Sequence, residues 1–219
     1  MDYNPSPLYN DVSQGPADCS AFWVMTDDKV KIRVGLWRAK SPIGTVFICP
    51  GRSEYIEKYG KTAKLFTEHG YTSVSLDWRG QGLADRLTSN TLLGHVDTFS
   101  DYLKDLDSAI KWAHNFDLPK PWFVLGHSMG GAIILRALHQ NKYFDAVAFS
   151  CPMWGIKLSP ALRIFAFFYG NLSKLLKIDK NFAPSTSEKG YFDESFADNP
   201  LTNDHETWQY LLDQVNKYP

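Results

Sequence analysis

The sequence lacks most of the signals that would place it in a specialised class of protein. Its 219 residues include three cysteines, which lie far apart and without the close spacing of a metal site. No run of lysine and arginine offers a footprint for nucleic acid, and the formal net charge is −1. The Gly-x-Gly at 80–82 lacks the further spaced glycine of a dinucleotide fingerprint, and no phosphate loop is present. We therefore expect no metal, no cofactor and no nucleic-acid partner.

Long apolar segments are missing as well. The N-terminal residues have neither the basic nor the apolar segment of a signal peptide. No apolar run approaches the roughly 20 residues that a membrane span needs. The sequence therefore predicts a cytoplasmic protein and leaves peripheral contact with the inner face of the membrane open. Hydrophobic residues at 44% and charged residues at 21% are ordinary for one globular domain with a sizeable core.

What is present is an alternation of strand and helix patterns. Short apolar runs typical of strands lie at 21–25, 30–37, 45–49, 71–77, 122–125 and 146–150. Helical patterns lie at 55–69, 98–115, 132–138, 160–178 and 204–216. Strands that alternate with helices of this length predict parallel βαβ units. We therefore expect an α/β fold with a doubly wound, mostly parallel sheet.

The chain divides into three parts by composition. Residues 1–18 are rich in proline, asparagine, serine and aspartate, and we expect them to form an irregular arm. Residues 19–153 hold the alternating strands and helices of the core. Residues 154–219 contain helical patterns without a βαβ unit, which predicts a helical cap over the site. The aromatic side chains of this cap could receive an acyl chain, or they could simply dock the cap onto the core.

The stretch around Ser128 carries the strongest chemical signal. A buried strand runs into Gly126-His127-Ser128-Met129-Gly130, and a helix of small and aliphatic residues follows within a few positions. A chain that turns so sharply holds its central residue in a strained conformation with the side chain exposed. Gly126 and Gly130 flank the serine because a Cβ there would collide with the neighbouring strand and helix. The pattern predicts a nucleophilic serine, with an ordinary glycine-rich turn as the alternative.

Four segments are expected to meet at this serine. In an open α/β sheet, ligands bind outside the carboxyl ends of the strands. Residues 49–54, 77–86 and 151–154 each follow a predicted strand, as Ser128 does. Their convergence at one edge of the sheet supports a site built around Ser128.

These motifs resemble those of the α/β-hydrolases, in particular the lysophospholipase L2 and monoacylglycerol lipase group with its serine aminopeptidase S33 relatives. The segment GHSMGG at 126–131 is similar to the nucleophile elbow of that family. PGRSE at 50–54 resembles its H-G-x-G-E loop, with Pro50 in place of the histidine, and DWRGQG at 77–82 resembles its D-x-R-G-x-G loop. The resemblance covers most of the chain. It implies an esterase acting on lysophospholipids or monoacylglycerols, or a peptidase within the same fold.

The resemblance also implies roles for single residues. Ser128 would attack the ester carbonyl and form an acyl-enzyme, and the backbone N–H groups of Met129 and Arg52 would form the oxyanion hole. Glu54 and Arg79 would brace the loops rather than react, the alternative for each being an ordinary surface charge. The full set of supporting residues is Gly51, Glu54, Asp77, Arg79, Gly126, His127 and Gly130.

The sequence departs from this family after the serine. In this fold an acid and then a histidine follow the nucleophile, and only His139 and His205 come after Ser128. His139 is predicted near the far end of the nucleophile helix and His205 in the cap, so neither triad partner is identifiable. We expect the chain to be the N-terminal portion of a longer hydrolase, with one sheet edge open to self-association. The alternative is a non-catalytic binding module that keeps the pocket without the base.

Overall fold

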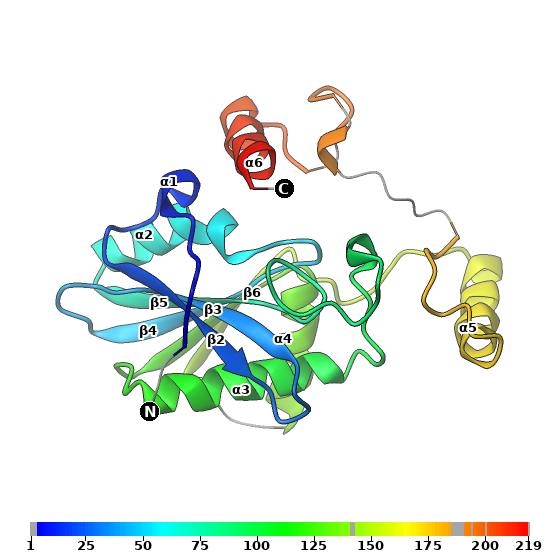
Figure 1. The fold of residues 1–219 in the computed structure, drawn as a ribbon, viewed down its shortest axis with the longest axis horizontal. Helices are drawn as coiled ribbons and strands as arrows, with labels where there is room; N and C mark the ends of the chain where they lie inside the picture. Colours follow the sequence, from blue (N-terminus) through cyan, green and yellow to red (C-terminus); the bar gives the residue numbers. More distant parts are fainter. Residues whose placement is uncertain (1–3, 141–142, 185–190, 194, 200, 219) are drawn as a thin grey trace.

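A seven-stranded mixed sheet forms the centre of the computed structural model, which describes residues 4–140, 143–184, 191–193, 195–199 and 201–218 (Figure 1). The strands are β1 (Asn4–Ser6), β2 (Cys19–Met25), β3 (Lys31–Trp37), β4 (Gly44–Cys49), β5 (Tyr71–Asp77), β6 (Trp122–His127) and β7 (Ala146–Ser150). Their spatial order is β1-β2-β3-β5-β4-β6-β7. β5, β4, β6 and β7 pair in parallel, whereas β1, β2 and β3 pair antiparallel. The α/β class predicted from the alternating pattern is therefore confirmed.

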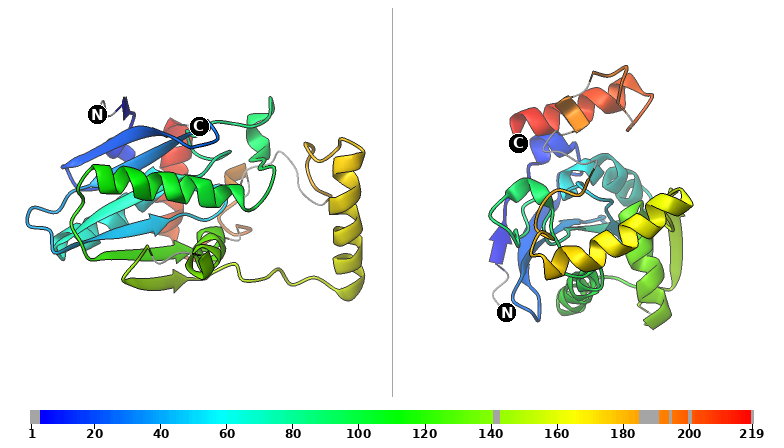
Figure 2. Two further views of the ribbon diagram at one scale, coloured as in Figure 1. Left: turned by 90° about the horizontal axis from the view of Figure 1, so that it is seen from below. Right: turned by 90° about the vertical axis from the view of Figure 1, so that its right-hand side faces the viewer.

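Helices cover both faces of the sheet (Figures 1 and 2). The 3₁₀ turn η1 (Ile56–Tyr59) and α2 (Gly60–Glu68) lie on one face, and α3 (Asp101–Asn115) and α4 (Met129–Gln140) lie on the other. The central strand β4 shows the division. Phe47 and Cys49 pack into the α3–α4 side of the core, while Val46 and Ile48 pack beneath Tyr59. Because both faces are covered, every residue of β4 is buried, which explains its uninterrupted apolar run.

The N-terminal segment is more regular than the expected arm over residues 1–18. β1 pairs antiparallel with β2, and a single helical turn, α1 (Asn10–Ser13), follows it. The residues Asn4, Pro5 and Ser6 of β1 do not favour a strand by their intrinsic propensity. Its extended form depends on the neighbouring strand, and such tertiary pairing leaves no periodic signal in the sequence.

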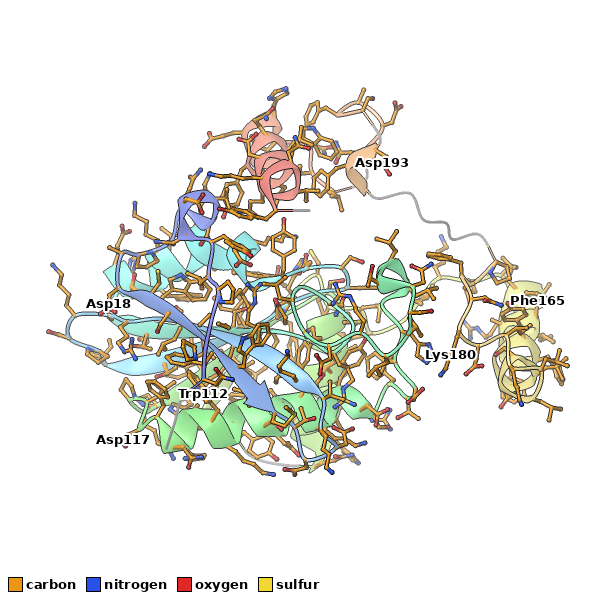
Figure 3. All side chains as sticks on the ribbon, in the orientation of Figure 1. Asp18, Trp112, Asp117, Phe165, Lys180 and Asp193 are labelled. Atoms are coloured by element: carbon orange, nitrogen blue, oxygen red, sulfur yellow. The ribbon has the colours of Figure 1, made fainter. Side chains whose placement is uncertain are left out.

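The C-terminal segment also differs from the expected single cap over 154–219. The helix α5 (Pro160–Leu175) stands beyond the carboxyl-end loops, apart from the sheet layers (Figure 2). In Figure 3, Phe165 lies on this outlying helix, whereas Trp112 of α3 lies against the core. Between α5 and α6, residues 191–193 form the short turn η3 (Tyr191–Asp193), and residues 185–190, 194 and 200 lie outside the described residues.

The last helix, α6 (His205–Lys217), packs on α1 rather than over the carboxyl-end loops. The hydroxyl of Tyr210 donates to the backbone oxygen of Ser13 at 2.7 Å. Farther along, the ring of Tyr218 stacks on that of Tyr9, with 3.7 Å between centroids. These contacts pack α6 against the N-terminal segment, and the division of the chain into a core and a cap over 154–219 stays a prediction.

Candidate active site

Ser128 occupies a strained corner between β6 and α4. Its φ is +48°, a left-handed conformation that costs a non-glycine residue about 1–2 kcal/mol. The backbone holds it there: its N–H donates to the carbonyl of Ser150 at 3.1 Å, and its own carbonyl accepts the N–H groups of Gly131 at 3.0 Å and Met153 at 2.9 Å. The chain therefore turns sharply from a strand into a helix at Ser128, and its role as a nucleophile elbow stays a prediction. Among the described residues, the Ser128 hydroxyl has no hydrogen-bond partner.

Three glycines allow neighbouring backbone to approach this corner. A Cβ on Gly126 would lie 2.8 Å from the Cα of Gly131. A Cβ on Gly130 would lie 2.1 Å from the backbone oxygen of Cys49. A Cβ on Gly51 would lie 3.0 Å from the Cβ of Ser128, so the loop after β4 lies directly against the serine. The predicted steric role of the two flanking glycines follows from these distances.

Two backbone N–H groups near the serine are available to a ligand. Met129 is the first residue of α4, and Arg52 follows Gly51 in the loop after β4. Within the part of the chain that the structure describes, neither N–H donates to a protein acceptor. The N-terminus of α4 adds a partial positive charge at the same place. An oxyanion hole is built from backbone donors of this kind, and the assignment of Met129 and Arg52 to that role stays a prediction.

Glu54 ties this loop together. Its carboxylate accepts the N–H of Gly51, the hydroxyl of Tyr59 at 2.5 Å and the ammonium group of Lys58. The Nε2 atom of His127 lies 3.6 Å from the same carboxylate. Burial raises the pKa of Glu54, but the charge and hydrogen bond of Lys58, with the other donors, outweigh it and hold the pKa below its ordinary value. Glu54 is therefore an ionised acceptor at neutral pH, with its oxygens already occupied.

Asp77 joins three segments at the end of β5. Its fully buried carboxylate accepts Nε of Arg33 at 2.7 Å, the N–H of Ile56 at 2.9 Å and the N–H of Leu83 at 2.8 Å. The two terminal nitrogens of Arg33 donate to Glu57 at 2.8 Å each. Burial raises the pKa of Glu57, and the charge of Arg33 opposes that rise. Asp77 thus acts through structure rather than by contact with the serine.

Arg79 connects the loop that follows β5 to two other segments. Its guanidinium donates to Asp105 of α3 at 2.9 and 2.8 Å and to Asp28, in the turn between β2 and β3, at 2.9 and 3.0 Å. Burial raises the pKa of Asp105 to about 6, although Arg79 acts in the opposite direction. These contacts agree with a bracing role for Arg79, which remains a prediction.

The described residues bring no general base to Ser128. The Nδ1 atom of His127 faces the backbone oxygen of Ser150 at 3.1 Å, which suits a bracing role. His139 is exposed at the far end of α4, and His205 begins α6 with its ring 4.9 Å from that of Phe196. Neither triad partner is identifiable among the described residues.

Sequence reasoning missed two side chains that contact the loop after β4. Nε1 of Trp78 donates to the backbone oxygen of Pro50 at 2.9 Å, and Oε1 of Gln81 accepts the N–H of Ser53. Both belong to the DWRGQG segment, whose resemblance to a family motif was the available signal. That signal does not say which backbone groups the side chains reach.

The family follows from comparison with known proteins. Residues 40–217 match the family model described as serine aminopeptidase, S33. The chain belongs to this hydrolase family. Among relatives of this S33-family chain, lysophospholipase L2 of Escherichia coli is 38% identical over 146 residues, covering 62% of this chain and 42% of that protein. Phospholipase YtpA of Bacillus subtilis is 33% identical over 147 residues, covering 65% and 54%. The chain thus spans about half the length of these curated relatives.

Solved structures support the same fold. A hypothetical protein from Pseudomonas aeruginosa superposes with a TM-score of 0.65 at 12% identity, covering 88% of this chain and 68% of that one. The α/β hydrolase GrgF from Penicillium superposes with a TM-score of 0.61 at 23% identity, covering 74% and 56%. The family match confirms the predicted resemblance and places the chain in a hydrolase family.

Proposed function

We propose that this chain carries the nucleophile and oxyanion hole of a serine esterase that cleaves lipid-type carboxylic esters, either lysophospholipids or monoacylglycerols. The observation that carries the proposal is the corner at Ser128, with its positive φ and free hydroxyl beside the unpaired N–H groups of Met129 and Arg52. The relatives named lysophospholipase and phospholipase support the lipid substrate class.

In the proposed reaction, the Ser128 oxygen attacks the ester carbonyl carbon and its proton passes to a base. The carbonyl oxygen becomes an oxyanion that accepts the N–H groups of Met129 and Arg52. The bond to the leaving alcohol then breaks, the alcohol takes up the proton, and water later hydrolyses the acyl-enzyme. Each oxyanion donor contributes on the order of 10²–10³ in rate, so the backbone of Arg52 matters more than its side chain. The base is a group that the described residues do not supply.

A fluorophosphonate probe tests the nucleophile directly, because it traps an activated serine without needing the true substrate. We expect labelling of a version extended to the length of the relatives, where a base can be supplied, and loss of that labelling in Ser128→Ala. Ser150→Ala is the matched control, since Ser150 lies at the end of the adjacent strand β7 and contributes mainly its backbone oxygen. Labelling that survives in Ser128→Ala would overturn the proposal. So would a lack of labelling in a version extended to the length of the relatives.

Substrate profiling separates the activities within this fold. We expect release of fatty acid from a lysophospholipid or a monoacylglycerol with the same acyl chain. Cleavage of short peptides at the N-terminus, with no fatty acid released, would instead favour the S33-type peptidase.

A non-catalytic binding module is the second candidate function. The observation that favours it is the lack of an acid and a base next to Ser128 in the described part of the chain. An intact-mass measurement of the native protein tests it. A native protein of 219 residues that binds lipid esters without turnover would support the module, and a longer native protein would favour the esterase.

We also propose that α5 mediates peripheral membrane contact. Large apolar side chains on it are exposed, Phe167 to 66% and Phe168 to 65%, and residues 155–178 contain lysine and arginine but no acidic residue. A helix of this character binds at a lipid interface. None of the described helices is both long and apolar enough to cross a bilayer. We expect the wild type to sediment with anionic phospholipid vesicles and the Phe167→Ser/Phe168→Ser variant to stay in the supernatant. Equal sedimentation of the wild type and the variant would contradict the proposal.

Self-association through the sheet edge is the remaining proposal. β7 is the last strand in the sheet order, and its Ala-Val-Ala-Phe-Ser segment has no charge or proline to protect the edge. Analytical ultracentrifugation should detect dimers that Ala148→Lys prevents. A monomer at all concentrations would contradict this proposal.

A further inference from the structure

The loop after β4 is held at both ends by side chains from the last residue of β5 and from the loop that follows it. At its start, the indole of Trp78 donates to the backbone oxygen of Pro50 at 2.9 Å. At its end, Asp77 accepts the N–H of Ile56 at 2.9 Å. Trp78 and Asp77 are themselves fully buried, so both anchors are part of the core. The middle of the loop, which contains Arg52, lies between them.

Gln81 supplies the anchor in the middle of this loop. Its side-chain oxygen accepts the N–H of Ser53, which has a φ of +61°. A serine in this left-handed conformation requires support from its surroundings, because the conformation costs about 1–2 kcal/mol. Gln81 is 5% exposed, and within the described residues its side-chain nitrogen has no hydrogen-bond partner. A buried donor without a partner lowers stability, so stability alone does not account for a glutamine here.

The anchors together determine the orientation of one peptide plane. The N–H of Gly51 donates to Glu54, and the N–H of Ser53 donates to Gln81. The Gly51–Arg52 peptide lies between these two fixed groups. Its N–H, that of Arg52, is the one amide of the three without a protein acceptor among the described residues. Fixing the peptides on both sides therefore points the free N–H in one direction.

We propose that Gln81 is a positioning residue that sets the orientation of the Arg52 oxyanion amide. The inference rests on the proposed esterase function, because it assigns a purpose to that amide. Without the Gln81 oxygen, Ser53 can leave its left-handed conformation and the Gly51–Arg52 peptide can rotate. The oxyanion donor is then misdirected, while the substrate-binding surface and the core stay intact.

Two variants at position 81 separate this role from a structural one. Gln81→Met keeps the length of the side chain but removes the acceptor, and Gln81→Glu keeps an acceptor oxygen. Gln209→Met is the matched control, because Gln209 is exposed on α6 and its side-chain nitrogen donates to Asp213 at 2.7 Å, far along the chain from the loop after β4. The first readout is backbone amide hydrogen exchange of Ser53 in the free protein. The second is the rate at which a fluorophosphonate labels Ser128, and, where turnover is measured, kcat and KM separately.

Gln81→Met should speed exchange at Ser53 at least about tenfold and slow labelling by about 10²-fold, the size of one oxyanion donor. Loss of a group that acts only in the transition state lowers kcat and leaves KM unchanged. The melting temperature should not fall, because the variant also removes a buried unpaired donor. Gln81→Glu should keep exchange at Ser53 slow and the labelling rate close to that of the wild type. Gln209→Met should match the wild type in both measurements.

Unchanged exchange at Ser53 in Gln81→Met would overturn the inference, and so would faster exchange with an unchanged labelling rate. A lower melting temperature with proportionate losses of kcat and binding would show a structural role instead and overturn it as well. A version extended to the length of the relatives that is not labelled at all would contradict the proposed function, and the exchange comparison would still decide whether Gln81 holds the loop.

Discussion

Asp77→Asn should destabilise this protein strongly, although it replaces only one carboxylate oxygen by an NH₂ group and keeps the size and shape of the side chain. The carboxylate satisfies three buried donors: Nε of Arg33 at 2.7 Å, the N–H of Ile56 at 2.9 Å and the N–H of Leu83 at 2.8 Å. These donors approach both oxygens, Oδ1 from Ile56 and Oδ2 from Arg33 and Leu83. An asparagine has one acceptor oxygen, so its NH₂ group must face at least one of the donors.

The size of the loss follows from these contacts. Breaking a buried ion pair by removing one partner costs about 3–5 kcal/mol, and each buried N–H left without an acceptor costs about 1–3 kcal/mol. Glu57 still pairs with Arg33 in the variant, which limits the electrostatic part of the loss. We therefore expect the free energy of unfolding to fall by about 3–5 kcal/mol, a large share of the roughly 5–15 kcal/mol that a domain has.

Urea unfolding followed by tryptophan fluorescence measures this difference. Asp85→Asn is the matched control, because the Asp85 side chain is 42% exposed and its ion pair with Lys31 is long, at 3.9 Å. An exposed pair of this kind contributes less than about 1 kcal/mol. A loss in Asp77→Asn of less than about 1 kcal/mol, or equal to that of the control, would refute the reasoning that Asp77 holds three segments together.

Three further predictions concern single positions. Gly130→Ala would place a Cβ 2.1 Å from the backbone oxygen of Cys49. We therefore expect the free energy of unfolding to fall by several kcal/mol, as measured by thermal unfolding. A melting temperature within about 2 °C of wild type would contradict this steric argument. Arg52→Pro removes the proposed oxyanion donor and should slow probe labelling of Ser128 by about 10²–10³, whereas Arg52→Ala keeps the N–H and should stay within about tenfold; equal effects would contradict the backbone role. Burial raises the pKa of Asp105 from 3.8 to about 6, so the folded state binds this proton more tightly than the unfolded state. Its contribution to the free energy of unfolding is therefore present below about pH 4 and is lost as the pH rises to about 6, by up to about 3 kcal/mol. Asp105→Asn should reduce the dependence of the free energy of unfolding on pH in this range, as measured by unfolding at a series of pH values.

The sequence by itself determined the features that depend on neighbours along the chain. The apolar runs at 71–77 and 146–150 coincide with β5 and β7, because strand burial depends on a local pattern of side chains. The corner at Ser128 was predictable for the same reason. The need for glycine at 126 and 130 follows from the sharp turn between a strand and a helix.

Only the tertiary structure decided which distant groups meet. Gln81 reaches Ser53, and Arg33 reaches both Glu57 and Asp77, because β3 and β4 flank β5 in the sheet, an order that no local pattern encodes. The packing of α6 on α1 and the separation of α5 from the sheet have the same cause. The sequence pattern of an amphipathic or apolar helix predicts that one face can be buried. The surface on which that face packs depends on the positions of the other elements.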